Sequence, residues 1–228
     1  MAVLRQKEAH LWERDPLDWY VEPEICSIGL FGEESFSGRI WDPACGLGRI
    51  VDSARAFGLS AVGTDIVRRS ATCERTFDFL GSQVEVGFDH IVSNPPFRHA
   101  EEFVQKAIEI VPQGGKVGML LPLVWLTGFS SKRDWLPRSP LKTLMPISPR
   151  PSMPPGAVVA SGGRVGNGTK DFAWFVWQKG YGEGCNVRFL NTNVWKRGRS
   201  IQKHGKAEIN PCEHPTAEFI SPRPMRLL

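Results

Sequence analysis

Residues 39–48, RIWDPACGLG, join a strand-like run to a glycine-rich turn. The run ends at Asp42, the turn contains Gly46 and Gly48, and the residues that follow have apolar side chains at helical spacing. The stretch therefore predicts a strand, a tight turn and a helix. Glycines in such a turn let the backbone approach a ligand at the carboxyl edge of a sheet, where open α/β folds bind ligands. A structural turn without a ligand is the alternative.

Strands and helices continue to alternate after this stretch. The hydrophobic pattern predicts strands at 60–65, 88–97 and 116–123 and a helix at 99–111. This order implies a mostly parallel sheet covered on both faces. Further along, a short helix is expected near 130–136, an apolar run covers 141–147, residues 149–170 have the composition of a loop, and strands resume at 171–180 and 186–191.

The glycine turn is followed by an acidic residue that suits a ribose. Asp65 lies 19 positions after Gly46, at the end of the second predicted strand, where its carboxylate can accept hydrogen bonds from two ribose hydroxyls. Val51 stands where a dinucleotide fingerprint needs a third glycine, and a GxxxxGK[ST] phosphate loop is absent. The pattern fits an adenosine-containing cofactor without a pyrophosphate, which is S-adenosylmethionine. A helix N-cap or a turn is the alternative role of Asp65.

The motif NPPF, Asn94 to Phe97, directly follows the apolar strand DHIV. Two prolines fix two φ angles and remove two backbone donors, which leaves carbonyl groups at this strand end free for a substrate. Acceptors from Asn94 and Pro95 can hold both N–H bonds of an aromatic amine, and this favours the pyramidal geometry in which its lone pair attacks. Phe97 would stack on a base removed from its helix. A strand terminator with a buried phenylalanine is the alternative.

With DPACGLG some fifty residues before NPPF, the sequence resembles the class I amino-methyltransferases of DNA, which carry DPAxGxG and [DNS]PP[FYW]. The resemblance covers residues 15–180; DWYVEP (18–23) and DFAWFVWQK (171–179) are similar to segments of phage and bacterial adenine methyltransferases. It implies an α/β, Rossmann-like fold with a mostly parallel central sheet, helices on both faces and a late antiparallel strand pair. It also implies methyl transfer from S-adenosylmethionine to the exocyclic amino group of adenine in DNA.

The resemblance assigns roles to individual residues. The catalytic residues would be Asn94, Pro95, Pro96 and Phe97. The methionine end of the cofactor would contact Tyr20, Pro23, Asp42, Ala44, Cys45, Gly46 and Gly48, while Asp65 would hold the ribose and Asp78 and Phe79 the adenine. The sequence departs from the family at Glu22, where threonine is common. The interval between the two motifs is also too short for a recognition domain.

Elements that recognise the target would therefore follow the catalytic motif. We expect a methyltransferase domain at 1–190, with a flexible substrate loop at 149–170, and a basic, irregular tail at 191–228. Residues 1–128 contain 12 Lys and Arg against 18 Asp and Glu, a net charge of −6, whereas residues 129–228 contain 16 against 6, a net charge of +10. A basic half favours an anionic partner, here nucleic acid, although a solvated surface is the alternative. The candidate contacts are Arg150, Lys170, Lys196, Arg197 and Arg199.

Composition excludes several other classes. No run approaches the length of about 18 apolar residues that a membrane helix needs, and MAVLRQKEAH is charged too early for a secretory signal, so a cytoplasmic protein is expected. The five cysteines form no CxxC pair, which predicts neither a disulfide framework nor a metal site.

Four other functions compete with DNA adenine methylation. RNA adenine methylation would use the same site. Protein glutamine methyltransferases share NPP, usually followed by tyrosine. A non-catalytic nucleic-acid-binding module would not require NPPF. Cytosine carbon-5 methylation needs a Pro-Cys nucleophile after the corresponding strand, and Pro211-Cys212 lies far downstream.

Overall fold

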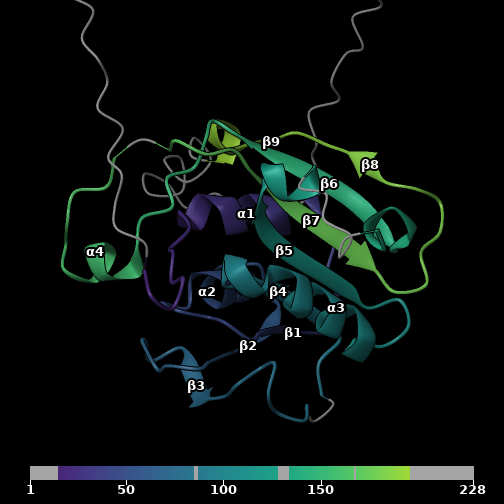
Figure 1. Ribbon diagram of the computed structural model, residues 1–228, viewed down its shortest axis with the longest axis horizontal. Helices are drawn as coiled ribbons and strands as arrows, with labels where there is room; N and C mark the ends of the chain where they lie inside the picture. The colour runs from purple at the N-terminus through teal and green to yellow at the C-terminus, as the bar shows by residue number, and fades with distance from the viewer. Residues whose placement is uncertain (1–14, 85–86, 128–133, 167, 196–228) are drawn as a thin grey trace, which may run out of the picture.

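The computed structural model describes residues 15–84, 87–127, 134–166 and 168–195. A nine-stranded sheet crosses the molecule in the order β3-β2-β1-β4-β5-β7-β6-β8, with β9 also paired to β6 (Figure 1). Strand β3 lies at one edge and β8 at the other. This arrangement confirms the predicted α/β class and its mostly parallel sheet.

The parallel part of the sheet carries the two motifs. It consists of β1 (Arg39–Asp42), β2 (Ser60–Asp65), β3 (Cys73–Thr76), β4 (His90–Ser93) and β5 (Lys116–Pro122). Because β1 is central and pairs with both β2 and β4, the residues that follow these three strands meet at one edge. This is the carboxyl edge at which parallel sheets bind ligands.

The remaining strands close the sheet on its other side. Strand β7 (Phe172–Gln178) is antiparallel to both β5 and β6 (Leu141–Ser148), which confirms the late antiparallel pair. The predicted strand at 186–191 is instead two short strands, β8 (Asn186–Val187) and β9 (Leu190–Asn191), both parallel to β6. Arg188 and Phe189 separate the two strands, and the Arg188 guanidinium pairs with the buried Glu34 carboxylate at 2.6 Å.

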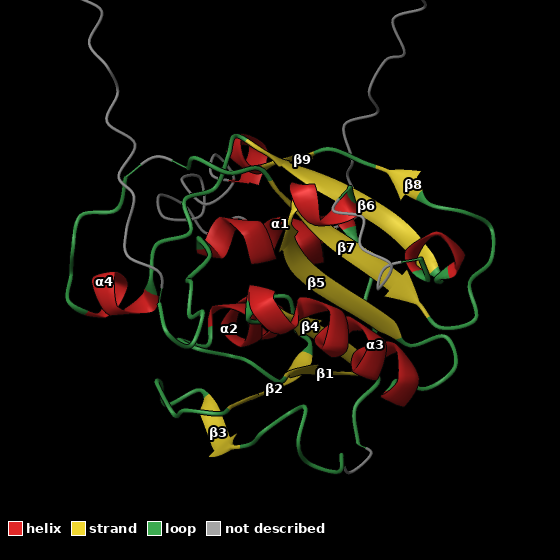
Figure 2. Ribbon diagram, in the orientation of Figure 1, coloured by secondary structure: helices red, strands yellow, loops and turns green. Residues whose placement is uncertain are grey.

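Helices cover both faces of the sheet (Figure 2). On one face, α1 (Glu24–Glu33) and α2 (Arg49–Ala56) pack on residues such as Val92 and Trp174. On the other face, α3 (Ala100–Ile110) packs on residues such as Ile91 and Phe175. Neighbouring strand residues thus enter opposite cores, as the two-residue period of a strand requires.

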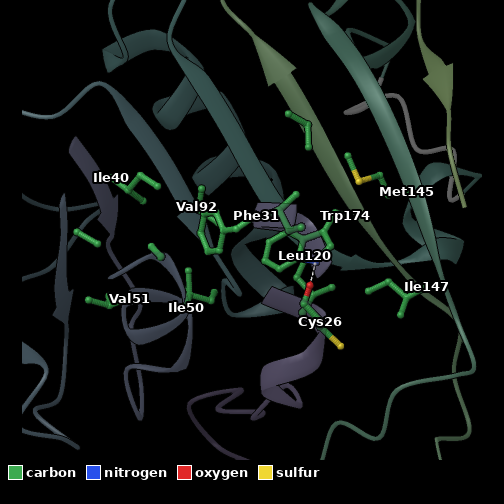
Figure 3. Close-up of a cluster of buried hydrophobic side chains, with 14 of the residues drawn as sticks. Cys26, Phe31, Ile40, Ile50, Val51, Val92, Leu120, Met145, Ile147 and Trp174 are labelled. Carbon is green, nitrogen blue, oxygen red and sulfur yellow. Dashed lines mark hydrogen bonds between the residues drawn. The ribbon is translucent and has the colours of Figure 1, made fainter. Parts of the chain in front are cut away.

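The core under α1 has a polar anchor. The buried indole of Trp174 donates a hydrogen bond of 2.9 Å to the carbonyl oxygen of Cys26 (Figure 3). This bond joins β7 to α1, so the segment that enters α1 has a fixed position relative to the sheet. Helix α1 and strand β3 were not predicted from the sequence.

The segment predicted to be a loop is partly ordered by burial. Residues 153–156 are buried, the short α4 (Gly156–Ala160) follows, and Tyr20 forms an antiparallel bridge with Pro155. The mobility expected for 149–170 stays a prediction, now best placed in its exposed part after residue 160. Of the short helix expected near 130–136, residues 130–133 lie outside the described residues, and a 3-10 turn covers Leu136–Arg138. The tail beyond residue 195 also lies outside them.

No helix in the described parts of the chain has the length and apolar character needed to cross a bilayer. Within the same residues, no group of three or more His, Cys, Asp or Glu side chains is arranged to hold a metal ion.

Candidate active site

A cavity of about 370 Å³ opens at the carboxyl ends of β1, β2 and β4. Five segments line it. They are the segment before α1, the glycine turn, the end of β2, the residues after β3 and the NPPF region. Most of the predicted site residues line this cavity: Tyr20, Asp42, Ala44, Cys45, Gly46, Asp65, Asp78, Phe79, Asn94 and Pro96. Pro23, Gly48, Pro95 and Phe97 lie outside its lining.

The glycine turn has the backbone geometry that only glycine adopts readily. Gly46 has φ 49° and Gly48 has φ 86°, both in the left-handed region. A Cβ atom on Gly48 would lie 2.5 Å from Cβ of Thr72, so a side chain would also clash there. Gly48 acts through the backbone, because it precedes the first residue of α2. Pro23 has the same kind of role at the start of α1.

Asp65 is tied to the glycine turn from the end of β2. Its carboxylate accepts hydrogen bonds from the backbone N–H of Gly46 at 2.8 Å and of Val67 at 3.0 Å. The Arg69 guanidinium pairs with the same carboxylate at 2.6 Å. It also lies 4.5 Å from the centre of the Trp19 ring. No helix begins directly after Asp65, so the N-cap part of the alternative role is wrong, but the bond from the Val67 N–H is the turn role that the alternative also named.

Four buried carboxylates line the cavity: Asp18, Glu22, Asp42 and Asp65. Burial raises the pKa of Asp42 well above its usual value, and the charges of Glu22 and Asp65 raise it further. Hydrogen bonds from the Ser93 hydroxyl at 2.7 Å and the Ala44 N–H at 3.1 Å act in the opposite direction. Burial also raises the pKa of Glu22. The cavity therefore favours a ligand with positive charge.

The Cys45 thiol stays protonated in this setting. Burial raises its pKa, and the charge of Asp42 adds to the shift. Because the thiolate is the nucleophilic form, Cys45 contributes a small neutral side chain to the cavity wall.

Asn94 lies at the start of the NPPF motif, directly after β4. Its amide nitrogen donates to the carbonyl oxygen of Tyr20 at 2.8 Å and to Oε2 of Glu22 at 2.9 Å. Its amide oxygen is buried, and no residue in the described chain donates a hydrogen bond to it. A buried acceptor without a donor is unfavourable by about 1–3 kcal/mol, so the side chain can gain from a ligand that brings an N–H group.

Phe97 is packed between two other aromatic rings. The Tyr20 ring is nearly parallel to it, with centroids 5.9 Å apart, and the Phe172 ring is 5.7 Å away. Tyr20 lines the cavity, whereas Phe97 does not. Stacking of a base on Phe97 stays a prediction.

Asp78 and Phe79 lie on the far side of the cavity. The Asp78 carboxylate accepts the N–H groups of Leu80 and Gly81 at 3.1 and 3.0 Å, which stabilises a turn. Phe79 is buried, with its ring 4.8 Å from that of Phe103. Both residues line the cavity, as a contact with the cofactor's adenine requires.

Trp19 and Arg69 are among the cavity residues that were not identified from the sequence. The Trp19 indole N–H is buried and has no partner in the described chain, and its nitrogen would be 3.0 Å from a Cβ placed on Gly46. Arg69 was also missed. The segment DWYVEP contained Trp19, but a tryptophan in a short segment gives no sign of which atom faces a ligand.

The predicted nucleic-acid contacts are placed only in part. The Arg150 guanidinium pairs with the Asp171 carboxylate at 2.6 Å, both exposed, and Lys170 is exposed. Lys196, Arg197 and Arg199 lie outside the described residues. Arg98 and His99, two exposed basic residues of the N-terminal half, line the mouth of the cavity beside NPPF.

No protein-family model matches the sequence, and no curated protein matches it. Solved structures do match. A Listeria monocytogenes protein described as a class I S-adenosylmethionine-dependent methyltransferase has a TM-score of 0.51 and 12% identity, over 78% of this chain and 67% of that one. An Agrobacterium tumefaciens protein described as an O-methyltransferase has a TM-score of 0.48 and 16% identity, over 74% and 85%.

The M protein of the type I restriction enzyme EcoKI has a TM-score of 0.49 and 16% identity, over 76% of this chain and 49% of that protein. The chain thus spans about half the length of this M protein. The three proteins are described by different activities, so the likeness concerns the fold. This chain has the Rossmann-like fold of the class I methyltransferases.

Proposed function

We propose that this protein transfers the methyl group of S-adenosylmethionine to the exocyclic amino group of adenine in DNA. The observation that carries the proposal is the buried, unpartnered amide oxygen of Asn94 at the carboxyl end of β4. Asn94 itself lines the cavity, at the strand end where a substrate amine would meet the cofactor.

The cavity residues fit the cofactor. S-adenosylmethionine carries a sulfonium and an ammonium group, which suit a wall with four buried carboxylates. The unpartnered indole N–H of Trp19 suits the cofactor's carboxylate, and the tight turn at Gly46 keeps side chains away from it. Asp65 suits the ribose and Phe79 the adenine. When bound, the cofactor supplies an electrophilic methyl group.

The chain's own contribution is to hold the amine. The amide oxygen of Asn94 and the carbonyl oxygen of Pro95 would accept the two N–H bonds of the target. This withdraws the nitrogen lone pair from the ring and orients it for attack, an effect that is larger in the transition state than in the ground state. The new N–C bond forms as the methyl–sulfur bond breaks, and the nitrogen then releases one proton.

DNA is the preferred substrate for two reasons. NPPF with DPACGLG resembles the DNA amino-methyltransferases, and the half of the chain that follows residue 128 has a net charge of +10. RNA has the same amine and the same phosphates, so it is the closest competitor.

The test supplies labelled S-adenosylmethionine with DNA, RNA or protein, followed by mass spectrometry of the hydrolysed products. We expect N6-methyladenine in DNA. Asn94→Ala should abolish it, while calorimetry shows cofactor binding unchanged. Label in RNA or in glutamine would replace DNA as the substrate, and full turnover by Asn94→Ala would remove Asn94 from the reaction.

A further inference from the structure

Glu22 is a buried carboxylate to which the proposed function assigns no part. The DNA amino-methyltransferases that the sequence resembles commonly have threonine at this position. The Glu22 residue is 6% exposed. It lines the cavity together with three other buried carboxylates, Asp18, Asp42 and Asp65, which makes its charge unfavourable unless a donor compensates it.

Burial raises the pKa of Glu22 and the charge of Arg49 lowers it, but the hydrogen bond of Arg49 goes to the Glu22 backbone and not to its carboxylate. The Arg49 guanidinium donates a hydrogen bond of 2.5 Å to the backbone carbonyl of Glu22. In the described chain, the side-chain donor to the Glu22 carboxylate is the Asn94 amide at 2.9 Å. This contact and the one to Tyr20 constrain Asn94, because turning its amide nitrogen away would leave both acceptors without that donor.

The two acceptors around the Asn94 nitrogen determine which way its amide faces. Tyr20 offers a carbonyl oxygen at 2.8 Å and Glu22 a carboxylate oxygen at 2.9 Å. If the amide rotated by 180°, its own oxygen would face both of these oxygens, and two hydrogen bonds would be replaced by repulsion. The amide oxygen is therefore directed away from Tyr20 and Glu22, without a partner of its own.

We propose that Glu22 is a positioning residue for Asn94: its carboxylate holds the amide so that the oxygen remains available to accept an N–H bond of the target amine. The role rests on the proposed function of Asn94. Glu22 acts through Asn94 and not through a contact of its own with the cofactor.

Two substitutions of Glu22 distinguish its hydrogen bond to Asn94 from an effect of its negative charge. Glu22→Gln keeps an oxygen that can accept from the Asn94 nitrogen, while Glu22→Ala removes it. We expect Glu22→Ala to lower kcat about tenfold and to change the Kd of S-adenosylmethionine by less than about threefold, the scale of one hydrogen bond. Glu22→Gln should keep most of the parental kcat. Glu109→Ala, an exposed carboxylate at the end of α3, is the control and should have no effect.

A double-mutant cycle tests whether the effect passes through Asn94. If Asn94→Ala leaves measurable residual turnover, adding Glu22→Ala should lower it no further, because the contact is already absent. Side-chain amide NMR supplies a measurement that does not need turnover. The Asn94 NH2 pair, assigned by its disappearance in Asn94→Ala, should shift and exchange faster with solvent in Glu22→Ala, but much less in Glu22→Gln.

The outcomes are distinct. A weakened cofactor Kd with unchanged kcat would make Glu22 a cofactor ligand and overturn the proposal, as would equal loss of kcat in Gln and Ala variants. An unchanged Asn94 amide signal in Glu22→Ala would also overturn it. If the parent protein methylates no amine, the proposed function fails, and the NMR result alone then decides whether Glu22 positions Asn94.

Discussion

The Arg69 guanidinium lies 2.6 Å from one carboxylate oxygen of Asp65, the residue proposed to hold the cofactor's ribose. The other carboxylate oxygen accepts the N–H of Gly46 at 2.8 Å. Both oxygens of Asp65 are thus engaged before any ligand arrives. A cofactor that binds to Asp65 must share this carboxylate with Arg69 or displace Arg69. We therefore expect opposite changes in cofactor affinity when Asp65 and Arg69 are substituted.

Asp65→Ala should weaken S-adenosylmethionine binding. Hydrogen bonds to a charged group contribute on the order of 1.5–3 kcal/mol, so the Kd should rise by roughly tenfold to a hundredfold or more. Calorimetry measures it, with Asp52→Ala on the exposed side of α2 as the control. An unchanged affinity would remove Asp65 from the cofactor site.

Arg69→Ala should strengthen the same binding. The variant lacks a competitor for Asp65 and a positive charge beside a cationic ligand, so the Kd should fall by up to about tenfold. The adjacent Arg68, which is exposed, is the matched control, and Arg68→Ala should leave the Kd unchanged. Weaker binding by Arg69→Ala would mean that Arg69 contacts the cofactor directly.

Trp19→Phe tests the buried indole N–H. The phenylalanine ring keeps most of the packing against Gly156 but lacks the donor that would meet the cofactor's carboxylate. We expect an affinity lower by about 0.5–1.5 kcal/mol, the net value of one hydrogen bond. Trp135→Phe removes an indole that donates to Glu101 outside the cavity, and should not change cofactor binding. Equal affinity in parent and Trp19→Phe would argue against this contact.

Asp42→Asn should stabilise the protein at neutral pH. Because burial raises the pKa of Asp42 in the folded state, that state binds a proton more readily than the unfolded chain, and stability falls as pH rises through this window. Asparagine keeps an acceptor for Ser93 and Ala44 and carries no charge. We expect a gain of about 1 kcal/mol at pH 8, or roughly 2–4 °C in Tm, that shrinks as the pH approaches 5.

Thermal unfolding across this pH range measures the gain, with Asp52→Asn as an exposed control. If Asp42→Asn is less stable than the parent at pH 8, the buried charge of Asp42 does not destabilise the folded protein.

The sequence predicted the parts of the site that depend on local pattern. Apolar strands that end at Asp42, Asp65 and Asn94 are visible in the sequence, and a parallel sheet brings such ends to one edge, so their proximity followed from topology. Gly46 and Gly48 were predictable because a left-handed turn selects glycine. For each of these residues, the residues next to it in the sequence were enough to predict its position.

Features that depend on tertiary contacts could not be predicted. Phe97 was expected to offer a free ring face, but Tyr20 and Phe172 pack on it, and neither contact leaves a trace near NPPF. Glu22 was noted as a departure from threonine, yet its contact with Asn94 joins residues 72 positions apart. Helix α1 was missed because its buried residues surround most of the helix, which hides the amphipathic period.

The basic half after Gly128 should bind the nucleic acid. The half that holds the cavity has a net charge of −6, which repels phosphates, whereas residues 129–228 carry +10. Lys196, Arg197 and Arg199 are the strongest candidates for contacts, since Arg150 is already paired with Asp171. Substitution of all three by alanine should lower the slope of log affinity against log salt by about one for each phosphate that the variant no longer neutralises.

Because phosphates carry no base identity, the triple variant should weaken binding to all DNA sequences about equally. Arg150→Ala is the comparison, and it should change the salt slope less than any one of the three, because its charge is balanced by Asp171 in the free protein. Fluorescence anisotropy of a labelled duplex at several salt concentrations measures both quantities. If the triple variant keeps the parental affinity and slope, docking does not use this tail. Arg98 and His99 at the mouth of the cavity then become the phosphate contacts to test next.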